Sequence, residues 1–171
     1  MLSKRQRWVG VLLLAAPLGT GATWWSMGRT VDADADAPIR LVVSLSEREL
    51  RVVEHGETIA TYGVAVGRKG HRTPTGNFRT GDIDWNPSWT PPPVKWAENK
   101  KYQPPGAPAN PMQAVKIYFQ APYYFIHGTN NPESIGEAAS HGCIRMIPDD
   151  ARELARRIER AGGNVPLTIS P

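Results

Sequence analysis

Cysteine is nearly absent from this chain, whose 171 residues include a single one, Cys143. A lone cysteine cannot form an intramolecular disulfide, and no Cys-x-x-Cys pair exists to hold zinc or to act as a redox couple. The thiol is therefore either an inert packing group or a group with chemistry of its own.

An excess of one charge sign is also absent from most of the chain. The net charge of +4 arises within residues 1–30, which contain no acidic residue. The basic residues of that segment are Lys4, Arg5, Arg7 and Arg29. Residues 31–171 carry 16 basic and 16 acidic side chains and are neutral overall. A neutral domain lacks the cationic surface that a phosphate backbone requires, so we expect no nucleic-acid partner.

The longest uncharged run is Trp8–Gly28, which as a helix would reach about 30 Å and just span a bilayer. One proline and two glycines weaken its second half, as in a secretory signal with a short apolar segment. Trp24 and Trp25 instead suit the interfacial belt of an uncleaved anchor. We predict that residues 1–30 are a signal peptide or an N-terminal anchor in the inner membrane. Either would export the domain that follows.

Residues 31–38 alternate aspartate with alanine and end in proline, which predicts a short acidic linker. From Ile39 onward, apolar residues recur with the period of two that is typical of strands. The predicted strands are 39–43, 50–52, 59–66, 77–79, 115–119, 123–127 and 165–169. One amphipathic helix should begin at Asp149 or Asp150 and end at the glycine pair 162–163. Residues 39–171 therefore form a mainly β domain with one helix in its C-terminal region.

Proline is concentrated in one segment, because eight of the sixteen prolines lie within residues 85–111. Strand and helix interiors do not tolerate that density, so we expect a long ordered loop. Trp85, Trp89 and Trp96 lie in this loop. They could line a groove for a peptide or glycan, or pin the loop to the sheet, and we expect packing for at least one.

Cys143 lies in the run Ser140–Arg145, Ser-His-Gly-Cys-Ile-Arg, and the run Ile126–Thr129, Ile-His-Gly-Thr, precedes it. A thiol becomes a useful nucleophile when a base removes its proton and backbone N–H groups receive the oxyanion. His127 is far enough from Cys143 in sequence for the chain to return and bring the two together. Because an exported lone thiol is prone to oxidation, a merely structural cysteine is disfavoured. These observations predict a cysteine enzyme.

The two motifs together resemble the signature of the L,D-transpeptidase catalytic domain, the YkuD-like family of bacterial cell-wall enzymes. Residues 67–78, 86–92 and 106–111 are similar to further conserved segments, so the resemblance covers most of residues 39–171. Met112-Gln113 departs from the Leu-Gly that relatives often carry. The resemblance implies a β-sandwich with the cysteine motif at the mouth of a groove, located in the bacterial periplasm or cell envelope.

The resemblance also implies roles at the site. Cys143 is the nucleophile and His127 its base, with the Gly128 carbonyl orienting the imidazole in place of a carboxylate. His141 lies two positions from Cys143 and stays an alternative base or a lining of the oxyanion site. The N–H groups of Gly142 and Cys143 are the expected oxyanion donors.

Three further residues are candidates for substrate binding. Ser140 should hold His141 by a hydrogen bond. The planar guanidinium of Arg145 suits a substrate carboxylate, although a solvated or structural arginine is an equal alternative. Thr129, at the end of the His-Gly-Thr motif, is the third.

A zinc site must also be weighed, because His127, His141 and Cys143 are all possible ligands. His55 and His71 lie in turns, and the spacing of the five residues does not match a zinc site. We expect no metal and no other cofactor.

The implied reaction is attack of Cys143 on the bond between the diamino acid and D-Ala of a peptidoglycan stem tetrapeptide. D-Ala leaves, and an amine of another stem peptide, a lipoprotein lysine or a free D-amino acid completes the transfer. With water as acceptor the protein would be an L,D-carboxypeptidase or a hydrolase of wall cross-links. A wall-binding module without turnover is the alternative of another class.

Overall fold

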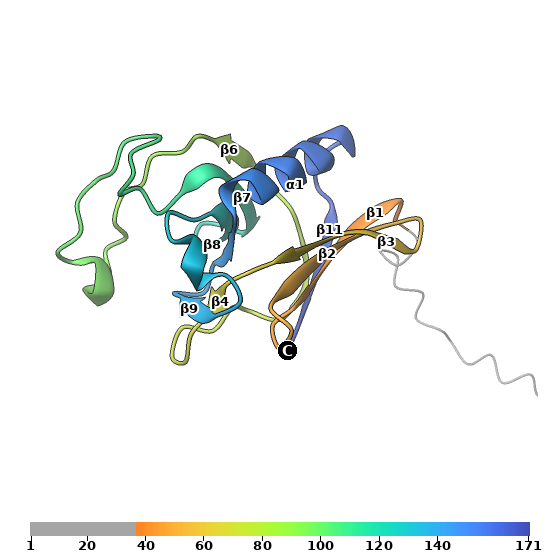
Figure 1. The fold of residues 1–171 in the computed structure, drawn as a ribbon, viewed down its shortest axis with the longest axis horizontal. Coiled ribbons are helices and arrows are strands. Elements are labelled where there is room, and N and C mark those ends of the chain that lie inside the picture. The colour runs from red at the N-terminus through yellow and green to blue at the C-terminus, as the bar shows by residue number, and fades with distance from the viewer. Residues whose placement is uncertain (1–36) are drawn as a thin grey trace, which may run out of the picture. The chain divides into compact units, whose positions relative to one another are not determined.

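The computed structural model describes residues 37–171 (Figure 1). The predicted signal or anchor and most of the acidic linker lie outside the described residues. Within them, no helix is long and apolar enough to cross a membrane. The strands are β1 (Ile39–Ser44), β2 (Glu49–Glu54), β3 (Glu57–Gly63), β4 (Val66–Gly67), β5 (Gly76–Arg79), β6 (Ile83–Trp85), β7 (Gln113–Gln120), β8 (Tyr124–Gly128), β9 (Ala138–Ser140), β10 (Ile144–Met146) and β11 (Pro166–Ser170). The helix is α1 (Pro148–Arg160), and two 3₁₀ turns cover Lys95–Ala97 and Pro132–Ser134.

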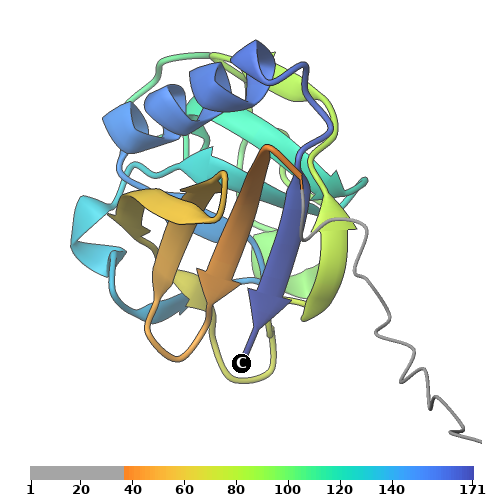
Figure 2. The ribbon, with the colours of Figure 1, turned by 90° about the vertical axis from the view of Figure 1, so that its right-hand side faces the viewer.

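Two sheets carry the architecture. One has five strands in the order β3-β2-β1-β11-β5, and the other has four in the order β10-β8-β7-β6. The short strands β4 and β9 pair separately. Figure 2 shows the five-stranded sheet toward the viewer, with α1 running across the top of the domain. The helix packs on β7 and β8.

The core follows from alternation along the strands. In β1, Leu41 and Val43 are fully buried while their neighbours are partly exposed. In β2, Leu50 and Val52 are fully buried on either side of the partly exposed Arg51, and the alternation ends at the irregularity between Val52 and Val53. Because successive side chains of a strand point to opposite faces, these residues share the inner face of the sheet. The buried cluster joins them to the apolar residues of β7, β8 and β10 and to one stripe of α1.

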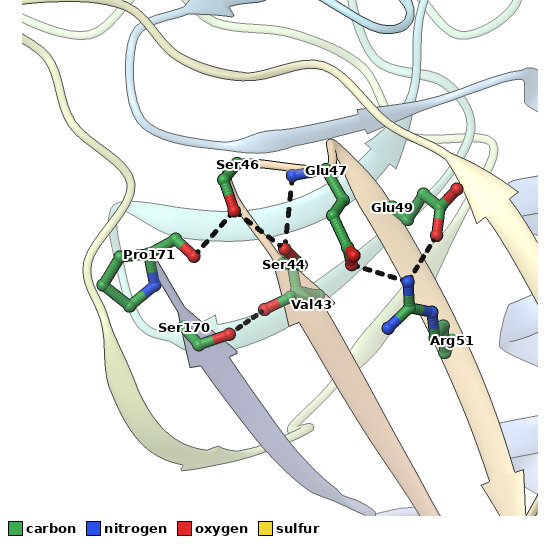
Figure 3. Close-up of polar contacts among 8 residues, drawn as sticks. All are labelled: Val43, Ser44, Ser46, Glu47, Glu49, Arg51, Ser170 and Pro171. Atoms are coloured by element: carbon green, nitrogen blue, oxygen red, sulfur yellow. Dashed lines mark hydrogen bonds and ion pairs between the residues drawn. The ribbon is translucent and has the colours of Figure 1, made fainter.

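The turn between β1 and β2 is tied to the C-terminus of the chain (Figure 3). Ser46 Oγ donates to the Pro171 carbonyl at 3.1 Å, and Ser170 Oγ donates to the Val43 carbonyl at 3.3 Å. The guanidinium of Arg51 bridges Glu47 and Glu49 across the same turn. These polar contacts close the end of the sheet at which the parallel strands β1 and β11 finish.

The proline-rich loop is ordered by two side-chain amides, as a loop without its own ladder requires. Asn110 is fully buried, and its Nδ2 donates to the carbonyls of Pro87 at 2.9 Å and Pro104 at 3.1 Å. Gln113 Nε2 donates to the carbonyls of Ala107 and Asn110 at 2.8 and 2.7 Å. Gln113, one of the two positions that depart from the family pattern, thus fixes this loop through its side chain.

The mainly β prediction with one helix is confirmed, and two details differ from it. The segment 59–66 is divided between β3 and β4, which belong to different sheets. The strands β1, β2 and β3 pair antiparallel, whereas β1 pairs with β11 and β8 with β10 in parallel. The helix begins at Pro148, which sits at the first helical position where a missing N–H is harmless.

We predict that Leu154→Ala lowers the free energy of unfolding by about 2–5 kcal/mol, because it leaves a cavity where α1 meets the core. Leu154 is fully buried. The matched control is Arg156→Ala on the exposed face of the same helix, expected to change stability by less than about 0.5 kcal/mol. Urea denaturation measures both, and equal effects would contradict the assigned orientation of the helix.

Candidate active site

The cysteine motif lies between β9 and β10, and the parallel pairing of β10 with β8 brings it to His127. The register places Arg145 opposite His127 and Ile144 opposite Ile126. Side chains alternate along a strand, so His127, Arg145 and Cys143 project from the same face. The fold therefore gathers the predicted nucleophile, the predicted base and an arginine at one end of the four-stranded sheet.

The hydroxyl of Ser140 holds the turn that presents Cys143. Ser140 Oγ donates to the Cys143 carbonyl at 2.6 Å and accepts the Gly142 N–H at 3.0 Å. Two predictions are corrected by these contacts. Ser140 does not bind His141 and is 1% exposed, too buried to meet a substrate. The Gly142 N–H is engaged by Ser140 Oγ, which leaves the Cys143 N–H as the expected oxyanion donor.

Gly142 is required at its position for two reasons. Its φ of 114° lies in the region that side chains with a Cβ rarely adopt. A Cβ there would also lie 2.7 Å from Cε1 of Tyr124, which packs over the turn. The backbone beside the thiol is thereby fixed by an aromatic ring.

His127 is a buried, neutral imidazole. Its Nδ1 lies 2.8 Å from the Gly128 carbonyl, the contact that the family resemblance implied. A carbonyl only accepts, so Nδ1 carries the proton and Nε2 keeps its lone pair. Burial lowers the pKa of His127 to about 4, although the Gly128 carbonyl favours the charged form. Gly128 also permits close packing, because a Cβ there would lie 2.3 Å from the Gln113 carbonyl.

Cys143 rests as a thiol. Its Sγ lies 3.5 Å from the carbonyl of Tyr123 and donates to it. Burial raises the pKa of Cys143 to about 11, outweighing the Phe125 N–H and the charges of Arg145 and Lys116, which favour the thiolate. At neutral pH the pair is therefore thiol and imidazole, and proton transfer must accompany attack on a substrate.

His141 is engaged by three neighbours that the sequence did not reveal. Arg68 Nη2 donates to His141 Nε2 at 2.7 Å. The Trp96 ring stacks on the imidazole with centroids 3.9 Å apart, and the His71 ring meets it edge-on at 4.7 Å. Burial, followed by the Arg68 charge, lowers the pKa of His141 to about 4. With its Nε2 lone pair occupied, His141 is less suited than His127 to act as base.

Of the three tryptophans of the long loop, two hold the loop in place and one contacts the active-site region. Trp85 Nε1 donates to Glu159 of α1 at 2.7 Å, so this residue pins the start of the loop. Trp89 exchanges two backbone hydrogen bonds with Gln103 inside the loop. Trp96, in the 3₁₀ turn, stacks on His141 of the cysteine motif. Packing of at least one tryptophan is confirmed.

Arg145 and Thr129 differ in what they offer to a substrate. Arg145 is half-buried, and burial is the main cause that lowers its pKa. Thr129 is 2% exposed, and its Oγ1 accepts the Asn131 N–H at 3.1 Å. The prediction of a substrate-binding Thr129 is therefore corrected: its hydroxyl shapes the turn after β8.

The described residues form no metal centre, and two cavities of the domain are not lined by the thiol. Between residues 37 and 171, no three His, Cys, Asp or Glu side chains converge as a metal site requires. A cavity of about 630 Å³ lies inside the long loop, between Pro91 and Tyr102, and one of about 470 Å³ lies beside β7. Cys143 lines neither, so the groove implied by the family resemblance is not among these cavities.

Comparison with known proteins now decides the family. The model of the YkuD family, the L,D-transpeptidase catalytic domain, matches residues 38–167. The chain belongs to this family. The L,D-transpeptidase YkuD of Bacillus licheniformis is 37% identical over 131 residues, covering 77% of this chain and 66% of that protein. The L,D-transpeptidase ErfK/SrfK of Escherichia coli is 33% identical over 122 residues, covering 67% of this chain and 39% of that protein.

Solved L,D-transpeptidases share the fold of this family member. LdtMt1 in complex with imipenem superposes with a TM-score of 0.62 at 19% identity, covering 78% of this chain and 59% of that chain. The Mycobacterium smegmatis enzyme gives a TM-score of 0.60 at 17% identity, covering 79% and 59%. The predicted L,D-transpeptidase fold is confirmed. The chain spans about two thirds or less of the curated relatives named above.

We predict that alkylation of Cys143 by iodoacetamide accelerates about tenfold per pH unit from about pH 7 to pH 10, because only the thiolate reacts. The raised pKa of about 11 places the plateau above this range. An ordinary cysteine, with a pKa near 8.5, levels off within it. Intact-protein mass spectrometry follows the reaction, with Cys143→Ala as the unreactive control. A plateau below about pH 8 would instead indicate a preformed thiolate–imidazolium pair.

Proposed function

We propose that this chain is a peptidoglycan L,D-transpeptidase that transfers the acyl group of a stem tetrapeptide to an amine. The observation that carries the proposal is the strand pairing at the cysteine motif: Cys143 lies one residue before β10, which pairs in parallel with β8, and β8 carries the buried neutral His127, whose Nδ1–H is held by the Gly128 carbonyl. Family membership over residues 38–167 supports the same assignment.

In the first half-reaction, Cys143 Sγ attacks the carbonyl carbon of the bond between the diamino acid and D-Ala. The thiol proton moves to His127 Nε2 as the C–S bond forms, which matches the resting protonation of the pair. The tetrahedral oxyanion receives the Cys143 N–H. When the C–N bond breaks, His127 returns the proton to the departing D-Ala amine. The product is a thioester on Cys143.

The second half-reaction runs the same chemistry in reverse. An acceptor amine attacks the thioester, His127 takes its proton, and the proton passes to the departing Cys143 sulfur. One amide is broken and one is formed, so the exchange needs no cofactor. The acceptor amine is that of another stem peptide, a lipoprotein lysine or a free D-amino acid, and water in its place would give the carboxypeptidase reaction.

We also propose that the domain works outside the cytoplasm, in the periplasm or cell envelope. The support is the basic and then uncharged segment of residues 1–30 and the cell-wall substrate of the proposed reaction. An uncleaved segment would anchor the domain to the inner membrane. A thiol kept protonated by burial also suits an oxidising compartment, because the thiolate is the reactive form.

We predict that Cys143→Ala and Cys143→Ser abolish release of D-Ala from a stem tetrapeptide, because both remove the thiol while leaving the turn held by Ser140. Mass spectrometry of tetrapeptide incubated with stem-peptide, lysine-peptide and D-amino-acid acceptors measures release and identifies the acceptor. Release at the wild-type rate by either variant would remove Cys143 as nucleophile.

His127→Ala should slow acylation of Cys143 by about 10²–10⁴-fold, the usual cost of losing a general base. The matched comparison is His141→Gln, whose amide oxygen can still accept the hydrogen bond from Arg68; we expect a loss below about tenfold. Single-turnover acylation by tetrapeptide separates the two, since it reports the first half-reaction alone. A larger loss in His141→Gln would exchange the two roles.

A further inference from the structure

Two arginines from different segments lie at the cysteine motif: the Arg145 charge acts on the Cys143 thiol, and Arg68 contacts His141. Arg145 is two residues beyond Cys143, and its backbone is fixed to the segment before β4 by paired hydrogen bonds with Ala65, 2.8 and 2.9 Å long. Arg68 follows three residues after Ala65, and its N–H donates to the Ser140 carbonyl at 3.1 Å. The backbone thus ties both arginines to the cysteine motif.

Neither guanidinium has a protein anion. Among residues 37–171, the ion pairs are formed by Arg51, Lys116, Arg152 and Arg157, and Arg79 has a further partner. Arg68 uses one of its five N–H donors on His141, and the side chain of Arg145 donates to no described residue. Arg145 is half-buried and Arg68 is exposed. A half-buried charge in a protein is normally paired, so the donors of Arg145 are available to an anion from outside, and the unused donors of Arg68 can reach the same anion.

The electrostatics of the site point the same way. The pKa of Arg145 is lowered by burial first, and the Arg68 charge lowers it further, while a negative Cys143 would raise it. Two cations that repel each other at the site are relieved when an anion binds between them. Arg68 is held in place by His141, which Trp96 covers from the other side, so the cation is preorganised for a ligand.

We propose that Arg68 and Arg145 form a carboxylate-binding site beside Cys143 that recognises the acyl donor. The proposal rests on the proposed function. A stem tetrapeptide has two carboxylates near the scissile amide, one on the terminal D-Ala and one on the side chain of the diamino acid. A planar guanidinium binds either one with two parallel hydrogen bonds.

The experiment compares three synthetic tetrapeptide donors, one with both carboxylates free, one amidated at D-Ala and one amidated on the diamino acid side chain. For the wild-type enzyme, kcat/KM for D-Ala release should fall about 10- to 100-fold on amidation of the recognised carboxylate, the size of a charge-assisted hydrogen bond. The sensitive donor identifies which carboxylate binds. Equal kcat/KM for all three donors would overturn the site.

Variants of Arg68 then test whether this residue causes the dependence of kcat/KM on the carboxylate. Arg68→Gln removes the charge and retains an amide N–H for His141. Its kcat/KM should therefore fall about 10- to 100-fold with the tetrapeptide that has both carboxylates free, and little with the tetrapeptide whose recognised carboxylate is amidated. Arg68→Lys keeps the charge but lacks the planar guanidinium, so its kcat/KM should lie between those of the wild type and Arg68→Gln. The control is Lys69→Gln, the same change of charge at the next, exposed position. An equal loss of Arg68→Gln with free and amidated donors would assign Arg68 a structural role only and overturn the proposal.

Failure of the proposed function gives a different result. Acylation by imipenem, followed by intact mass, checks Cys143 independently of any peptide donor, since a relative of this fold is known in complex with that compound. If imipenem acylates Cys143 and no donor releases D-Ala, the tetrapeptide activity fails and the carboxylate site fails with it. Turnover that is indifferent to amidation overturns the carboxylate site alone.

Discussion

The parallel ladder between β8 and β10 joins segments that are well separated in sequence and sets His127 opposite Arg145. Every catalytic contact described above depends on this register. A slip of β10 by one residue would turn Cys143 and Arg145 to the face of the sheet opposite His127. Two features hold the register: the fully buried Ile126–Ile144 pair within the core, and Gly128, whose missing side chain lets the Gln113 backbone pass close by.

The same burial that fixes the geometry sets the protonation states. Enclosure raises the pKa of the thiol and lowers that of the imidazole, so both groups rest uncharged. The proton is then shared only when a substrate carbonyl offers a place for the developing negative charge. The Gly128 carbonyl favours the imidazolium at that moment, in the manner of a carboxylate but without a permanent negative charge beside the sulfur.

Sequence reasoning reached the elements whose signals are local. Alternating apolar residues predicted β1 and β2, the glycine pair at 162–163 marked the end of α1, and the motifs around His127 and Cys143 indicated the family. Sequence reasoning did not predict contacts between residues that are far apart in the sequence. Arg68 and His141 are 73 positions apart, and no local pattern announces that one binds the other. For the same reason, Ser140 and Thr129 looked like substrate ligands, because their burial is a property of the folded domain and not of the motifs.

The proline-rich loop is attached to the rest of the domain by Trp85 on α1 at its start, by Trp96 on His141, and by the Pro108 carbonyl, which accepts from Asn130 Nδ2. The loop meets the active-site region at Trp96 and again at its end, where a hydrogen bond with the Pro111 backbone favours the charged form of His127 and so raises its pKa. Residues 86–111 contribute no strand to either of the two sheets, so the loop can change its side chains without disturbing the strand pairing. Changes in the loop would therefore alter the surroundings of two histidines at once, His141 through Trp96 and His127 through Pro111.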